Sequence, residues 1–511
     1  MTVVPDRERV VAPLEAFSTL PDWLAAAMDG ERVAASLQHH APVLRADHGV
    51  VLAWVTACRP ERLRAKDGTW VARYRVTVRA GEAERDVVLV GELVPPPHQP
   101  TGPEVGDGAF VSDGDRHTHT DVDRDRHTDG DPDGAAGEWS CWLPDLRLRL
   151  RSEAGDPALP ALPVLTHAPD TTRLLQLVLR RAGHPDAVIA SCDPVVVRYK
   201  PGSRCTVVVG VTYADTVASA PPTTVVLKTH QGDKGQTAWA AMTALWARQE
   251  AWRGVVEMAE PLAFLPEERI LVQGPVPEDL TLKELARRAF AGGDQDTLAS
   301  LRVALAATGR GLAALHRSGA EYGRTATLAD EVAEIREVVG RLSVTVPGLG
   351  GAAEPLLSRV EQLAGDPQPG PAVVPSHHDF RPAQVLLHEG SVGFIDFDGA
   401  AMAEPALDLG RFTAKLRDIG ISSMAFTGQR LSGPVLRSHL ALVDSLCEDF
   451  VGGYAAESGV SRERVLLWET CDLLTGLLHA WTKVRLARVG PRLTLLQHRV
   501  RALTDGAPST G

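Results

Sequence analysis

Hydrophobic and polar positions change their spacing several times along the chain, and each change predicts a different kind of element. A short helical stretch at 22–28 is followed by stretches rich in β-branched and aromatic residues at 50–56, 70–78 and 85–94. Turn residues separate these stretches, as in Lys66-Asp67-Gly68. We therefore expect residues 1–95 to form a small β-rich module. The pattern does not indicate what this module does.

The pattern breaks between residues 96 and 138. Asp, Arg, His, Thr and Gly make up almost all of 113–134, so this stretch has little apolar surface to offset the entropy lost on ordering. We expect a disordered insertion over 96–138. Asp129, Asp131 and Asp133 repeat the first half of a calcium-binding loop. Calcium binding is the weaker interpretation, because Ser140 stands where the loop needs a bidentate Glu and Pro132 interrupts it.

Regular patterns resume at Trp139. Alternation predicts strands, a period of 3.6 predicts helices, and Thr281 with Glu284 forms the signature of a capping box. The predicted order is a helix, a hairpin, a strand, a helix, two strands, a connector, further helices, a second hairpin and more helices. We therefore predict an α+β fold with two lobes, a β-rich lobe over 139–276 and a helical lobe over 277–505, separated by a crevice near 274–277. The predicted elements lie at 146–150, 170–181, 195–199, 206–211, 223–228, 236–251, 259–264, 269–273 and 301–316.

Composition narrows the class of protein. The chain has 511 residues, enough for two or three domains, and its formal net charge of −12 gives no support to nucleic-acid binding. Six cysteines lie far apart without a C-x-x-C pair, which is typical of reduced, buried thiols. The first residues lack an apolar signal segment, and the most apolar C-terminal stretch, 465–481, is interrupted by charged residues. We expect a cytoplasmic protein that does not bind a membrane.

The stretch 376–398 carries the candidate chemistry. Asp379 follows His377 by two positions, Gln384 comes five residues later, and Asp396 ends an apolar strand. This spacing suits phosphoryl transfer: one carboxylate orients an attacking hydroxyl, and an amide oxygen and a second carboxylate bind magnesium. His377 would pack beneath the loop, and a short hairpin would carry the set. A surface turn with a chance H-x-D is the alternative for Asp379 considered alone.

Other residues could complete such a site. Asp398 could hold a second ion, since two neighbouring carboxylates repel each other without a cation, although an acidic turn is the alternative. Arg381 could neutralise charge on the transferred group, or could simply be exposed. Lys228, at the end of a strand, could reach the phosphates of a nucleotide, or be an exposed lysine. Gly202 and Ser203 could approach the phosphates through backbone amides, although a plain β-turn is nearly as good an interpretation.

Together these motifs resemble the aminoglycoside phosphotransferase and choline kinase-like family, small-molecule relatives of protein kinases, over roughly 140–490. The resemblance rests on H-H-D-F-R-P-A-Q, F-I-D-F-D, V-V-L-K, L-A-A-L-H, E-P-A-L-D-L-G and F-V-G-G-Y. It implies a protein kinase-like fold, ATP and Mg²⁺ as cofactors, and a small-molecule hydroxyl acceptor. It also implies that Asp379 is the base, that Gln384 and Asp396 bind the metal, that Lys228 contacts phosphate, and that 273–276, including Gln273 and Val276, form the adenine-binding hinge.

Three departures from the family accompany the resemblance. Gln384 replaces the usual Asn, the helix after Lys228 offers no Glu at the expected spacing, and the first 140 residues have no counterpart. A nucleotide-binding pseudokinase or regulatory module is therefore the alternative to an active kinase. A protein kinase is disfavoured, because 396–404 is too short for an activation loop.

The sequence does not identify the phosphate acceptor, although a sugar, polyol or amino alcohol is favoured over an aminoglycoside. The sequence does not indicate the oligomeric state. Acceptor contacts are expected from the acidic and aromatic residues after 410, namely Asp444, Glu448, Asp449, Trp468, Asp472, His479 and Trp481. Asp408 should brace the catalytic loop by accepting backbone hydrogen bonds.

Overall fold

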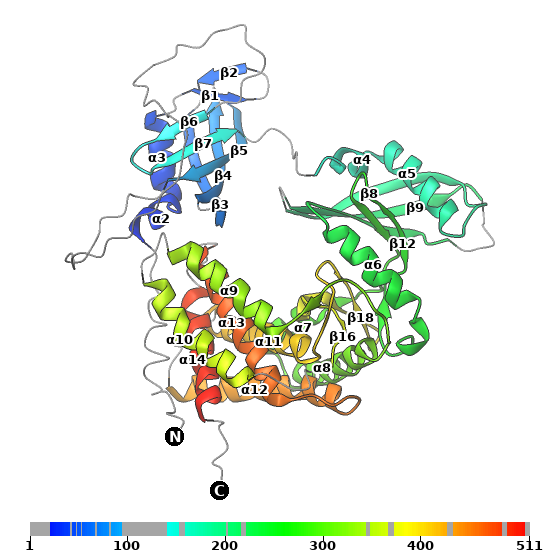
Figure 1. Ribbon diagram of the computed structural model, residues 1–511. Helices are drawn as coiled ribbons and strands as arrows, with labels where there is room; N and C mark the ends of the chain where they lie inside the picture. Colours follow the sequence, from blue (N-terminus) through cyan, green and yellow to red (C-terminus); the bar gives the residue numbers. More distant parts are fainter. Residues whose placement is uncertain are drawn as a thin grey trace, which may run out of the picture. The chain divides into compact units, whose positions relative to one another are not determined.

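A computed structural model describes most of the chain, and its helices and strands are labelled in Figure 1. The described residues are 21–40, 43–46, 49–52, 54–66, 69–80, 83–94, 140–152, 159–200, 203–215, 221–343, 348–365, 372–426, 433–482 and 488–505. The insertion expected at 96–138 and Gly202 lie outside them, so these predictions stay as they are. The chain divides into two compact units, Pro21–Ala154 and a larger one that includes Gly155–Gly511.

The smaller unit is an antiparallel sheet accompanied by two helices. Its strands follow the order β3-β4-β5-β7-β6, and β1 and β2 pair as a separate hairpin. The alternation expected from the sequence is present on β4, where Trp70, Ala72, Tyr74, Val76 and Val78 are buried and the residues that alternate with them are less buried. The Tyr74 hydroxyl donates to the carbonyl of Ala27, 2.9 Å away, and so joins the sheet to the end of α2. The elements are α2 (Asp22–Ala27), α3 (Gly30–His40), β1 (Val43–Ala46), β2 (Gly49–Leu52), β3 (Trp54–Lys66), β4 (Thr69–Ala80), β5 (Ala83–Leu93), β6 (Ser140–Leu143) and β7 (Leu148–Ser152).

The boundary expected near residue 139 is wrong. Strands β6 and β7 were expected to open the second lobe, yet β7 pairs with β5, with Leu93 opposite Leu148 and Leu89 opposite Ser152. These strands therefore complete the first sheet, across the 96–138 segment. Local alternation predicts that a strand exists, but it does not reveal which distant strand supplies its hydrogen bonds.

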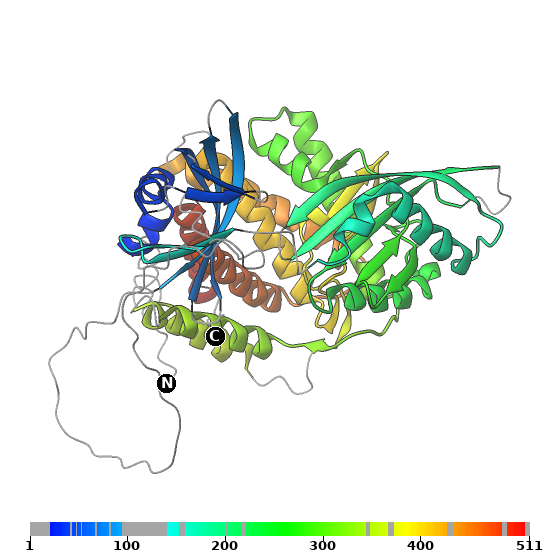
Figure 2. The same ribbon diagram turned by 90° about the horizontal axis from the view of Figure 1, so that it is seen from above.

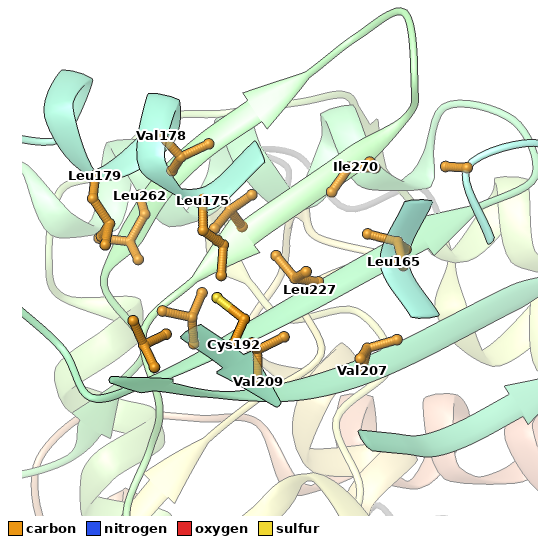
Figure 3. Packing of buried hydrophobic residues seen from close by; sticks show 14 of the residues in the cluster. Leu165, Leu175, Val178, Leu179, Cys192, Val207, Val209, Leu227, Leu262 and Ile270 are labelled. Carbon is orange, nitrogen blue, oxygen red and sulfur yellow. The ribbon is translucent and has the colours of Figure 1, made fainter. Parts of the chain in front are cut away.

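The larger unit begins with a second five-stranded antiparallel sheet, in the order β12-β13-β10-β9-β8. Helices α4 (Leu162–Thr166) and α5 (Ala168–Arg181) place Leu165, Leu175 and Leu179 against its strands, where they meet Val207, Leu227 and others (Figure 3). Because successive strand residues point to opposite faces, Leu227 in this core leaves Lys228 on the other face. The strands are β8 (Ile189–Lys200), β9 (Arg204–Tyr213), β10 (Thr224–His230), β12 (Pro261–Leu265) and β13 (Ile270–Gln273).

Helix α6 (Lys234–Trp246) follows β10, and two small sheets then carry the candidate motif. The first has the order β11-β18-β17-β14, with β11 at Glu257–Met258, β14 at Leu280–Thr281, β17 at Val385–His388 and β18 at Ser391–Phe394. Glu389 and Gly390 both have positive φ in the turn between β17 and β18, as a tight two-residue hairpin requires. The second has the order β15-β19-β16, with strands at Thr325–Ala326, Ala401–Ala403 and Val374–Ser376. The hairpin predicted to carry the motif is therefore present.

The rest of this unit is helical. The predicted capping box begins α7, where the Thr281 hydroxyl accepts from the Glu284 amide and the Glu284 carboxylate accepts from the Thr281 amide. Helices α11, α13 and α14 lie side by side (Figures 1 and 2). The helices are α7 (Leu282–Phe290), α8 (Gln295–His316), α9 (Leu328–Ser343), α10 (Leu349–Ala364), α11 (Ala406–Phe426), α12 (Gly433–Ala455), α13 (Arg462–Thr482) and α14 (Val489–Asp505). A β-rich first part and a helical second part confirm the predicted α+β class.

Helix α8 is long and apolar enough to cross a membrane by length and composition alone. Half of its most apolar window is buried inside the protein, which is also the pattern of a core helix. It packs tightly on α12. A Cβ on Gly309 would lie 2.2 Å from the carbonyl oxygen of Phe450, and one on Gly453 would lie 2.3 Å from that of Ala306. The two glycines therefore allow the backbones of α8 and α12 to approach each other closely.

Candidate active site

The loop that carries Asp379 is held by a buried carboxylate. Asp408, in the first turn of α11, is fully buried and accepts hydrogen bonds from the backbone amides of His377 and His378, each at 2.7 Å. This is the bracing role predicted for Asp408. Burial raises the pKa of Asp408, but hydrogen bonding to His316 and the amides outweighs burial and leaves the pKa below its usual value.

His316 extends this support to the helices. Its Nε2 lies 3.1 Å from Asp408 and its Nδ1 lies 3.0 Å from the Tyr454 hydroxyl. A carboxylate can only accept, so Nε2 carries the proton and Nδ1 accepts from Tyr454. The L-A-A-L-H and F-V-G-G-Y motifs thus meet at the base of the loop.

His377 supports the loop from below. It is fully buried, its Nε2 donates to the carbonyl of Ile395 at 2.9 Å, and its ring lies 4.6 Å from that of Phe397. Because it is not exposed, His377 cannot touch a substrate. It is a positioning residue that ties the loop to the strand end beside Asp396, as its expected packing beneath the loop suggests.

Asp379 has one oxygen bound and one facing outward. Its Oδ2 accepts from Gln384 Nε2 at 3.1 Å and lies 3.1 Å from Arg381 Nη2 in an ion pair. Its side chain is 46% exposed, and within the described parts of the chain no hydrogen bond to Oδ1 is found. Gln384 and Arg381 therefore hold the carboxylate while Oδ1 remains free to accept from a hydroxyl.

Asp396 lies just beyond β18 in a left-handed conformation, with φ of 75°. Non-glycine residues adopt this region rarely, and such strain gathers at functional sites. Its Oδ1 lies 3.2 Å from Lys228 Nζ and its Oδ2 lies 3.2 Å from Arg204 Nη1. Burial raises the pKa of Asp396, but the charges of Lys228 and Arg204 outweigh it and hold the pKa well below its usual value. Lys228 therefore pairs with this Asp, in keeping with the missing Glu on α6.

Asp398 is held by two residues that sequence reasoning did not single out. His230 Nε2 lies 2.8 Å from its Oδ2, and Arg204 Nη1 lies 3.1 Å from the same oxygen. His230 follows Lys228 by two positions on β10 and stands opposite Arg204 on β9, so all three side chains share one face. The two-residue spacing from Lys228 to His230 was a signal available in the sequence, whereas the contribution of Arg204 depends on strand register.

The donor set fits a hard divalent cation. Gln384 Oε1 and Asp398 Oδ1 are buried and have no hydrogen-bond partner in the part of the chain that the structure describes, and Asp396 supplies further carboxylate oxygen. Amide and carboxylate oxygens are the ligands that Mg²⁺ prefers. In the described part of the chain no group of three or more His, Cys, Asp and Glu side chains is placed to hold a metal, and a site here would combine the two carboxylates with the amide of Gln384.

The residues expected to contact a nucleotide are only partly brought together. Lys228 points at Asp396. Ser203 directly precedes β9, which begins with Arg204, and its amide donates to the Lys200 carbonyl at 3.0 Å. Gln273 is buried at the end of β13, and Val276 lies in the connector that follows. Their roles in binding adenine stay predictions.

Several expected acceptor contacts are structural instead. Trp468 is 1% exposed and donates to Glu404 at 2.6 Å, so it cannot contact an acceptor. Three of the acids pair with cations of the helices: Asp444 with Arg417, Glu448 with Arg462, and Asp449 with Arg302. Spacing along a helix predicts which of its positions are polar, but it does not predict which neighbouring helix those positions face.

Charged pairs lie closer to Asp379. Arg411 binds the His378 carbonyl and Glu331, and Asp472 pairs with Lys415. The charges of Glu331, Asp472 and Asp379 all act on Arg411, so these groups are near one another. Burial, and then the charge of Arg411, lowers the pKa of His378 to about 3. The imidazole of His378 is therefore neutral at physiological pH.

Comparison with known proteins gives one family match and a group of structural similarities. A model of the phosphotransferase enzyme family matches residues 217–431. A glucosamine kinase structure is 18% identical, with a TM-score of 0.43, over 96% of this chain and 100% of its own. A glucosamine kinase in complex with glucosamine, ADP and inorganic phosphate is 19% identical, with a TM-score of 0.44, over 88% of this chain and 94% of its own. Choline kinase LicA from Streptococcus pneumoniae is 12% identical, with a TM-score of 0.40, over 66% of this chain and 99% of its own. No curated protein sequence matches the chain.

Proposed function

Because residues 217–431 belong to the phosphotransferase enzyme family, we propose that this protein transfers the terminal phosphoryl group of ATP to a hydroxyl of a small molecule. The observation that carries the proposal is the convergence of Asp379, Gln384 and Asp396. The Gln384 amide nitrogen lies 3.1 Å from the Asp379 carboxylate and 3.5 Å from that of Asp396. A base for the acceptor and ligands for a cation thus lie side by side, as in-line transfer requires.

In the proposed reaction the acceptor hydroxyl donates to Asp379 Oδ1. The hydroxyl oxygen forms a bond to the terminal phosphorus of ATP while the P–O bond that joins this phosphorus to ADP breaks. The electron pair of the broken bond stays on ADP. The hydroxyl proton passes to the Asp379 carboxylate late in the reaction. Arg381, 3.1 Å from Asp379 Oδ2, would meet charge on the transferred group.

Gln384, Asp396 and Asp398 would hold Mg²⁺, which when bound supplies positive charge to the phosphates. The longer side chain of Gln, compared with the Asn usual at this position, does not prevent this arrangement. The Gln384 amide already lies against both carboxylates through its nitrogen, and its oxygen is buried without a partner among the described residues, so a turn of the amide about its last bond would bring the oxygen to the same place. We therefore favour an active enzyme over a pseudokinase.

For the acceptor we favour a neutral molecule rich in hydroxyls, such as a sugar or polyol. The charged side chains near Asp379 are already paired with one another, as in Arg411 with Glu331 and Lys415 with Asp472. A polycation such as an aminoglycoside would be expected to meet a surplus of carboxylates instead.

The test is ATP consumption by the full-length protein with Mg²⁺ across sugars, polyols, amino alcohols and aminoglycosides. Asp379→Asn keeps the shape of the side chain but removes the base, and turnover should fall by about 10²- to 10⁴-fold. Arg302→Gln, which alters a surface ion pair with Asp449, is the matched control and should keep its turnover. Equal turnover by wild type and Asp379→Asn would refute the assigned base. Magnesium-dependent ATP binding without turnover on any acceptor would instead favour the regulatory alternative.

A further inference from the structure

Arg204 lies where the divalent cation of the proposed function would bind. Its Nη1 is 3.2 Å from Asp396 Oδ2, 3.4 Å from Asp396 Oδ1 and 3.1 Å from Asp398 Oδ2. One nitrogen thus contacts both carboxylates, as a bridging metal ion would. Because two cations cannot share that position, Arg204 and a metal that bridges Asp396 and Asp398 exclude each other.

The charges around Arg204 also indicate that Arg204 and a bridging metal ion exclude each other. Lys228 and Arg204 already balance the charges of Asp396 and Asp398, and all four side chains are largely buried. A divalent ion added beside both cations would leave the group strongly positive in a poorly solvated place. A triphosphate brings the negative charge that such a group lacks, and it would attract the guanidinium away from the carboxylates.

The position of Arg204 allows this move. It is the first residue of β9, next to the turn that follows Lys200, and its side chain is 16% exposed. Its Nε is buried and has no hydrogen-bond partner among the described residues, so the guanidinium can still take part in a second hydrogen bond. His230, opposite Arg204 on β10, keeps Asp398 in place when Arg204 leaves.

We infer that Arg204 holds Asp396 and Asp398 together before the substrate binds, and that it exchanges these carboxylates for the phosphates when the nucleotide binds, which leaves the carboxylates free for the divalent cation. Arg204 is then a binding residue for the triphosphate as well as a competitor of the free metal ion. The inference rests on the proposed function only in taking a nucleotide triphosphate with its cation as the ligand.

The test separates the two ligands. Binding of Mn²⁺ alone, followed by the electron paramagnetic resonance signal of the free ion, should be about tenfold tighter or more in Arg204→Gln than in wild type, because the competing charge is gone. Binding of ATP in EDTA should be about tenfold weaker in the same variant, because a charged contact to phosphate is lost. Arg204→Lys, which keeps the charge, should stay nearer to wild type in both measurements.

Arg198→Gln is the matched control. It removes the same charge from β8. The charges of Asp396 and Asp398 also act on Arg198, but in the described residues no hydrogen bond joins it to either carboxylate, so Mn²⁺ affinity should rise less than in Arg204→Gln. Circular dichroism checks that each variant is folded. Mn²⁺ affinity that is unchanged or lower in Arg204→Gln, or that rises equally in Arg198→Gln, overturns the inference. If the proteins show the expected binding of Mn²⁺ and ATP but the wild-type protein phosphorylates no acceptor, the proposed function is wrong and the role of Arg204 in binding is still supported.

Discussion

Replacing Asp408 by Asn should destabilise the larger unit and displace the catalytic loop. Asp408 accepts from two backbone amides at 2.7 Å and from His316 at 3.1 Å, in a fully buried position. Asn has one acceptor oxygen, and its NH₂ group would face a donor, so at least one buried N–H loses its partner. An unpaired buried donor costs about 1–3 kcal/mol. We expect a loss of about 1–3 kcal/mol in the free energy of unfolding.

The assay is urea unfolding followed by tryptophan fluorescence, together with turnover of the folded enzyme. Asp418→Asn on the same helix is the control, because Asp418 pairs with Arg492 and not with the loop. Both variants should lose stability, but only Asp408→Asn should also lose about 10²-fold in kcat, since misplacing a catalytic group by about 1 Å costs that much. A loss of less than about 1 kcal/mol in Asp408→Asn, or equal kcat losses in both variants, would refute the reasoning.

Three further outcomes are expected. Lys228→Met should raise the KM for ATP by about tenfold to a hundredfold, because a charged contact is lost, and steady-state kinetics that show no change would contradict the phosphate role. The unfolded chain protonates His378 near pH 6.5 while the native state does so only near pH 3, so the free energy of unfolding should fall as the pH drops between these values. His378→Asn should make the free energy of unfolding, measured by urea titration, depend less on pH in this range. An unchanged pH dependence in the variant would contradict the assigned role of His378. Gly453→Ala should lower the urea midpoint because its Cβ meets Ala306, whereas Gly452→Ala, with open space around it, should leave the midpoint unchanged or raise it; equal shifts would show that the helix contact is not tight.

Much of the site could be predicted because its residues are close in sequence. Asp379 and Gln384 lie on one loop, and Asp396 is reached by a single hairpin, so motif spacing alone brings them together. Lys228 could be recognised because it lies on a strand with a regular pattern. These inferences need only local geometry, which a sequence displays directly.

The rest depended on contacts between distant parts of the chain. The pairing of β7 with β5 spans the 96–138 segment, and no local pattern reveals it. Arg204 reaches Asp396 and Asp398 from nearly 200 positions away, and the sequence shows only an arginine after a turn. Trp468 was expected at an acceptor site as one of the aromatic residues after 410, yet its indole donates to Glu404 inside the protein. Residue type and spacing suggest what a side chain can do, but burial decides whether it does so.

The ion pairs of the site also explain how the chain can lack a Glu on the helix after Lys228. Such a Glu would fix the lysine within its own lobe, whereas here Lys228, Arg204 and His230 all reach across to the two carboxylates that follow β18. The electrostatic contact that orients the lysine is therefore the same contact that joins the five-stranded sheet to the motif hairpin. Any ligand that takes over Arg204 or Lys228 must weaken this connection, so binding of a triphosphate and the relation between the two lobes are coupled through the same four charges. A carboxylate on α6 would separate these two tasks, and its absence combines them.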